Sequence, residues 1–139
     1  MEQRYKFRVP EPLWRAKTLG QRVERATEAY QAIYWRLTST TAPLDGERVS
    51  SSRIGNREDA LVIAGDKRDR LKRQYDRAVS EAMRIIDLLD DERHQDILTL
   101  RYVAGLTPAE CAKTMHYSAS WERELHRDAI EAFKRAWKK

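Results

Sequence analysis

Between residues 12 and 40 the chain places apolar side chains at alternating steps of three and four residues. The positions are Ala16, Leu19, Val23, Ala26, Tyr30, Ile33 and Leu37, and Arg, Glu, Gln and Lys fill most of the places between them. This spacing is typical of a coiled-coil stripe on one face of an α-helix, three heptads long. A helix of this kind buries little surface alone, so the pattern predicts a helical partner.

A second stripe with the same steps follows after residue 56. Its positions are Leu61, Ala64, Arg68, Leu71, Tyr75, Ala78, Ala82, Ile85 and Leu89. Gly65 lies inside this pattern and costs the helix about 1 kcal/mol relative to alanine. Arg68 interrupts the apolar seam, but its aliphatic stem can lie along it.

The segment between the stripes is rich in residues that favour turns, with Pro43 and Gly46 among threonine and serine. Asn56 is expected to be the N-cap of the second helix. We therefore expect residues 12–89 to form an antiparallel helical hairpin with a loop at about 40–55, extended by self-association. The alternative is two helices folded onto a C-terminal core.

Composition points to an all-α protein without a catalytic or metal site. Glycine and proline number only 5 and 4 among 139 residues, and the single cysteine, Cys111, rules out a CxxC metal site or an internal disulfide. His94, His116 and His126 lack metal-ligand spacing, and GxSxG, HExxH and Gly-rich phosphate loops are missing. We expect no enzyme activity, cofactor or membrane partner, and a cytoplasmic location.

The C-terminal part begins and ends its helices with recognisable signals. Asp90 or Asp91 can cap a helix that ends at Gly105 in the C′ position. The motif TPAE at residues 107–110 then predicts a capping box, with threonine as N-cap, proline at the first helical position and glutamate at N3. The tripeptide HYS follows as a turn, and Ser118 can cap the next helix.

These short helices have apolar faces that can pack together. Cys111, Ala112 and Met115 supply one face, and Trp121, Leu125, Ala129, Ile130, Phe133 and Trp137 supply a broader one. Three short helices with such stripes predict a trihelical core.

Residues 95–134 resemble the region-4 helix-turn-helix of bacterial sigma-70 factors. They are closer still to the sigma-like helix-turn-helix of small phage and prophage transcriptional regulators of the RinA/ArpU type. The matching residues are Leu100, Arg101, Tyr102, Gly105, Leu106, Thr107, Glu110, Ala112, Met115, Tyr117, Ser118, Leu125, His126, Ala129 and Ile130. In that family the helix that opens near Ser118 enters the major groove of DNA.

The resemblance implies a phage- or prophage-type DNA-binding transcriptional regulator in the cytoplasm of a bacterial host. It implies base contacts from Ser120, Arg123, Glu124 and Arg127, and phosphate contacts from Thr107, Lys113, Tyr117 and Ser118. Double-stranded DNA is the implied partner. RNA polymerase and a second copy of the chain, as a homodimer, are further candidate partners.

Two features depart from the family pattern. Glu122 stands where sigma-like proteins usually have an apolar residue, and we expect Trp121 to take over that packing through a small rotation of the helix. Residues 90–139 carry 9 Lys/Arg against 9 Asp/Glu, whereas residues 1–40 carry 8 against 4. DNA affinity must therefore come from an uneven charge distribution or from the basic N-terminal half.

The sequence divides into a flexible basic arm at 1–11, the helical hairpin at 12–89 and a sigma-like helix-turn-helix domain at 90–139. Two other functions fit this division. A small terminase-like DNA-packaging subunit also joins a helix-turn-helix to an oligomerising hairpin. A sigma-like protein-interaction module would keep the fold without autonomous DNA binding.

Overall fold

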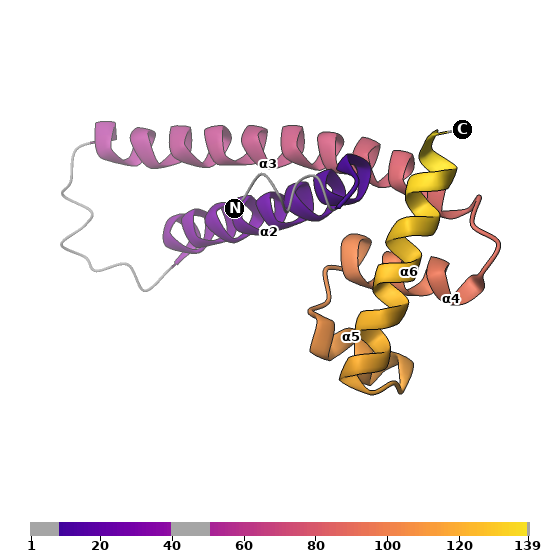
Figure 1. Ribbon diagram of the computed structural model, residues 1–139. Coiled ribbons are helices and arrows are strands. Elements are labelled where there is room, and N and C mark those ends of the chain that lie inside the picture. Colours follow the sequence, from indigo (N-terminus) through magenta and orange to yellow (C-terminus); the bar gives the residue numbers. More distant parts are fainter. Residues whose placement is uncertain (1–8, 40–50, 139) are drawn as a thin grey trace, which may run out of the picture. The chain divides into compact units, whose positions relative to one another are not determined.

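The computed structural model describes residues 9–39 and 51–138, of which 51–55 are described through their backbone alone. Its helices are α2 (Glu11–Thr38), α3 (Ser51–Ile86), α4 (Glu92–Leu98), α5 (Pro108–Met115) and α6 (Ala119–Lys138), and a π-helical turn, η2 (Thr99–Val103), continues α4 (Figure 1). The described ranges contain no strand, which confirms the all-α fold class. None of these helices is long and apolar enough to cross a membrane.

The boundaries of the two longest helices follow the sequence signals only in part. Helix α2 opens in a proline-flanked first turn, where the Pro10 carbonyl accepts hydrogen bonds from two amides at 3.1 Å. Asn56 is not the N-cap of α3, because the helix already begins at Ser51. An asparagine inside a helix costs only about 0.7 kcal/mol relative to alanine, too little to end it. The predicted arm at 1–11 and loop at 40–55 lie largely outside the described residues.

The chain forms two compact units. We call residues 22–73 the middle unit, and residues 1–21 together with 74–139 the terminal unit. Helices α2 and α3 each contribute to both. In the middle unit the ring of Tyr30 lies beside Gly65, where an added Cβ would stand 3.2 Å from the ring. The guanidinium of Arg68 lies 4.2 Å from the centre of the same ring. Gly65 and Arg68, the two residues that depart from the apolar pattern of α3, therefore both lie against Tyr30.

The terminal unit contains the main apolar core. Its fully buried side chains come from every helix that reaches the unit, and include Leu13, Ile85, Ile86, Ile97, Leu98, Cys111 and Phe133. Helix α6 packs against both α4 and α5. The predicted apolar faces of the short helices therefore meet in one core, except for Trp121 and Trp137, which are exposed, and α6 is supported along its inner side.

The predicted caps of the short helices are confirmed. Asp91 is the N-cap of α4 and accepts a hydrogen bond from the Arg93 amide at 2.8 Å. Gly105 has a positive φ of 78° directly after the C-cap Ala104, a conformation that glycine adopts at little cost. Thr107 and Glu110 form the predicted reciprocal capping box, with Pro108 in the first turn of α5.

Candidate nucleic-acid interface

Helix α5 is joined to α6 by a turn of three residues. His116 ends α5 in the left-handed conformation, with φ 61°, and the Tyr117 amide donates to the Ala112 carbonyl at 2.8 Å. The Ser118 hydroxyl oxygen then accepts the Trp121 amide at 3.1 Å, which caps α6 as the sequence predicted. The reversal is thus held by hydrogen bonds on both sides of the turn.

Helix α6 has one buried face and one exposed face. The buried face is formed by Glu122, Leu125, Ala129, Ile130 and Phe133. The four residues predicted to contact bases, Ser120, Arg123, Glu124 and Arg127, are all exposed. Their spacing places them on one face of the helix, because residues three and four apart are neighbours. Arg123 and Arg127 form no ion pair within residues 9–39 and 51–138.

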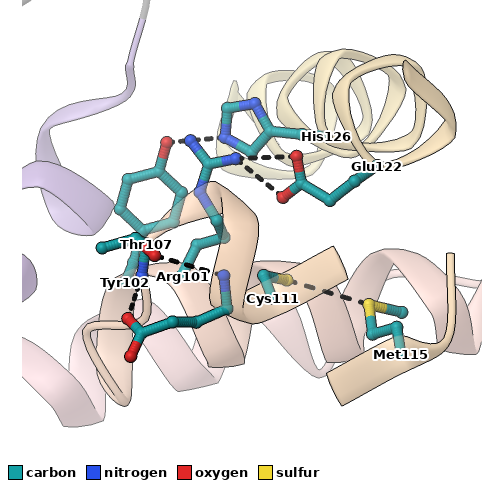
Figure 2. A network of polar contacts seen from close by, with 8 residues as sticks. Arg101, Tyr102, Thr107, Cys111, Met115, Glu122 and His126 are labelled. Carbon is teal, nitrogen blue, oxygen red and sulfur yellow. Dashed lines mark hydrogen bonds and ion pairs between the residues drawn. The ribbon is translucent and has the colours of Figure 1, made fainter. Parts of the chain in front are cut away.

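The expectation that Trp121 replaces an apolar residue at the position of Glu122 is wrong. Trp121 is 41% exposed, and Glu122 is buried at 2%. The Glu122 carboxylate accepts hydrogen bonds from Arg101 Nη1 at 2.8 and 3.2 Å (Figure 2). Arg101 comes from the π-helical turn η2. Its positive charge lets α6 bury a carboxylate without rotating.

A second polar contact lies beside this ion pair. Tyr102 Oη is 2.7 Å from His126 Nε2, and the two rings stack with centroids 5.7 Å apart (Figure 2). Burial, together with the positive charges of Arg101 and Lys17, lowers the pKa of His126 to about 4. Burial also raises the pKa of Tyr102 to about 12. At neutral pH an uncharged imidazole therefore meets an uncharged phenol inside the unit.

This histidine predicts acid sensitivity. Because the pKa of His126 is lower in the folded protein than its usual 6.5, the unfolded chain takes up the proton first. We expect the contribution of neutral His126 to the free energy of unfolding to be complete above about pH 6.5 and to be lost as the pH falls towards 4. Urea unfolding at pH 7.5, 5.5 and 4.5 measures this loss, and His126→Gln removes its contribution in that window.

The matched control is His116→Gln, which removes an exposed histidine in the same unit. Asp91 acts in a separate window, because hydrogen bonds from Arg93 lower the pKa of that carboxyl to about 2. The stability that the Asp91 carboxylate contributes to the folded protein is lost below about pH 4. An equal pH dependence in His126→Gln and the parent between pH 6.5 and 4 contradicts the assignment.

The residues predicted to contact phosphate differ in how accessible their polar groups are. Lys113 is exposed and forms no ion pair in the described ranges, and Tyr117 is partly exposed with its ring edge against Trp121. Ser118 sits at the N-terminus of α6, where amides lack intrahelical partners. Thr107 is less suited, because its amide donates to the Glu110 carboxylate at 2.9 Å and that negative charge already occupies the N-terminus of α5.

The single cysteine is a core residue. Cys111 is fully buried, and its Sγ lies 3.9 Å from Met115 Sδ (Figure 2). Burial, together with the nearby Glu122, raises the pKa of the thiol to about 11. A thiol that stays protonated at neutral pH is a poor nucleophile. The inner residues of this region therefore hold α6 in place, and the outer residues are the ones available to a partner.

Sequence reasoning missed the buried pair of Arg101 and Glu122. One signal was present: a glutamate on the apolar stripe of an amphipathic helix requires a buried cation nearby. The sequence does not say which arginine supplies the charge.

The chain has no match among models of protein families, curated proteins or solved structures. The case for function rests on the arrangement of α5 and α6 and on the residues that carry the sigma-like resemblance.

Proposed function

We propose that the chain is a DNA-binding transcriptional regulator of the phage or prophage type, with α5 and α6 as a sigma-like helix-turn-helix and α6 as the recognition helix. The observation that carries this proposal is the exposed row of Ser120, Arg123, Glu124 and Arg127 on a helix supported from inside. The row combines donors and acceptors, and both of its arginines lack an ion-pair partner among the described residues.

The row suits the edges of bases in the major groove. An arginine can donate two hydrogen bonds to guanine O6 and N7, and a glutamate can accept from cytosine N4. We assign the first role to Arg123 and Arg127 and the second to Glu124. Ser120, near the start of α6, can donate or accept.

Phosphate contacts in this proposal come from the turn and from α5. Lys113, which forms no ion pair among the described residues, supplies a positive charge, and Ser118 with the first amides of α6 supplies a helix N-terminus. Tyr117 contributes a hydroxyl. These groups would set the position of α6 on the duplex, while its exposed row would read the sequence.

The proposed hairpin completes the architecture as a device for self-association. A dimer would bring a second α6 to a second half-site, about one helical turn away on the DNA. The exposed apolar side chains of Trp35, Val62 and Ile63 on α2 and α3 support this arrangement, because the stripes themselves are buried or partly buried within the chain.

Selection of bound duplexes from a random pool tests the proposal. We expect an enriched sequence, and an affinity for it that falls steeply as salt rises from 50 to 200 mM, because bound phosphates release counterions. Fluorescence anisotropy on the enriched duplex measures both. Absence of binding to any duplex at about 50 mM salt contradicts the proposal and favours a protein-interaction module. A ring of eight or more subunits that binds DNA favours a packaging subunit.

A further inference from the structure

The middle unit contains a groove of about 530 Å³ between α2 and α3. Arg22 and Arg25 line it from α2, and Lys67 lines it from α3. The rest of the lining consists of Ala26, Ala29, Ala64 and Leu71. Among the described residues, the groove therefore combines positive side chains from both helices with small apolar ones, and Leu71 is the one large apolar side chain.

Nothing in the lining neutralises these positive charges. The three cations are exposed, form no ion pair in the described part of the chain, and share the groove with no carboxylate. Glu24 and Glu28 lie roughly 200° and 240° around α2 from Arg22, at about 100° per residue. Glu28 lies only about 60° from Arg25 on the same helix, but neither glutamate belongs to the described lining of the groove.

Charge is distributed unevenly between the two units. Over its described residues, 22–39 and 51–73, the middle unit carries 10 Lys/Arg against 6 Asp/Glu, a balance of +4. Over residues 9–21 and 74–138, the terminal unit carries 12 against 13, a balance of −1. The unit that holds α6 therefore has no net positive charge to attract a polyanion, whereas the middle unit has one.

We propose that this groove binds the phosphate backbone of duplex DNA as a second, sequence-independent contact. The inference rests on the proposed function, because that function supplies the duplex. Cations on both sides can flank a ridge of phosphates, and small alanines let the sugar-phosphate chain approach closely. The charged side chains that line the groove, Arg22, Arg25 and Lys67, are all positive and its apolar ones are mostly small, so the groove favours a polyanion over a peptide, which needs pockets for large side chains.

The test uses a duplex of about 30 base pairs that lacks any selected sequence, with fluorescence anisotropy between 50 and 200 mM salt. The variant Arg22→Gln/Arg25→Gln/Lys67→Gln removes three phosphate contacts. Each contact contributes about 0.9 to the slope of log affinity against log salt, so the slope decreases by about 2.7. Across this salt range the Kd of the parent therefore rises about 40-fold more than that of the variant.

The control variant is Arg70→Gln/Lys72→Gln/Arg73→Gln. It removes the same charge from exposed residues of the same unit that do not line the groove. We expect a salt slope close to that of the parent. Both variants should keep the helical circular dichroism of the parent, because all six side chains lie at the surface or groove rim. Equal slopes for the groove variant and the control overturn the inference.

Other outcomes separate this inference from the proposed function. If the parent binds no duplex, both fail. If Arg123→Ala/Arg127→Ala abolishes sequence preference while the groove variant matches the control, the inference alone is overturned. Loss of polyglutamate binding in the groove variant with an unchanged DNA salt slope also overturns it, and identifies an acidic-peptide site.

Discussion

The substitution Arg101→Met is expected to lower the free energy of unfolding by about 3–5 kcal/mol. Its partner Glu122 is 2% exposed, and Arg101 Nη1 donates to both carboxylate oxygens. Removal of the arginine leaves a buried carboxylate that must stay charged without a partner or take up a proton. Urea unfolding followed by circular dichroism at 222 nm measures the loss.

The double variant Arg101→Met/Glu122→Leu tests whether the loss of stability comes from the unpaired buried charge. It removes both members of the pair and places an apolar residue on the buried face of α6. We expect it to recover most of the lost stability, because a buried ion pair replaced by apolar residues of similar volume is often neutral or stabilising. Its DNA affinity should match that of the parent, because neither residue belongs to the exposed row.

An exposed ion pair provides the matched control for this experiment. Arg84 Nη2 lies 2.9 Å from Glu81 Oε1 on the surface of α3. Arg84→Met should leave the urea midpoint unchanged, because solvent screens an exposed pair. If Arg101→Met is no more destabilising than Arg84→Met, the pair does not support α6 as described.

Arg123→Ala should cost about 1–3 kcal/mol of binding free energy on the selected duplex and relax the preference at one base pair. Lys113→Ala should instead weaken binding to all duplexes alike and reduce the salt slope by about 0.9. The reason is that a base edge carries sequence information and a phosphate does not. Anisotropy on the selected duplex and on single-base variants of it separates the two effects.

Arg135→Ala controls for charge in this comparison. Arg135 is exposed on the same helix, more than two turns beyond the predicted row. It changes the net charge by the same amount as Arg123→Ala, so the two variants differ only in position. Parental affinity and base preference in Arg123→Ala would show that the recognition face is placed on the wrong part of the molecule.

Local signals in the sequence predicted much of the helical framework. Capping by Thr107 and Asp91 and the left-handed glycine at 105 depend on contacts within a few residues, so short motifs specify them. The start of α3 was predicted too late, because the expected N-cap, Asn56, lies five residues after Ser51, where the helix begins. Residues 51–55 carry no apolar periodicity that marks a helix, and Asn56 is a common N-cap.

The sequence was enough to predict the outward face of α6, but it was not enough to predict the contacts of the inner face. Amphipathic spacing alone places Arg123 and Arg127 opposite Leu125 and Ala129. The same spacing misplaced Trp121, because an aromatic ring is the more favourable choice for a core when only residue type is considered. The groove in the middle unit depends on two helices whose cations are about 40 residues apart in sequence.

The sequence by itself determined that the chain is helical, where its short helices begin and that Ser120, Arg123, Glu124 and Arg127 are exposed on α6, because propensity, capping and periodicity act over a few residues. Tertiary structure alone decided that Glu122 is buried against Arg101, that His126 meets Tyr102, and that Arg22, Arg25 and Lys67 share one groove. Those pairings join residues far apart in the chain. A charge can be buried in the core only when folding brings an opposite charge within a few ångströms of it. Like charges concentrate at a surface only when folding brings their side chains equally close together.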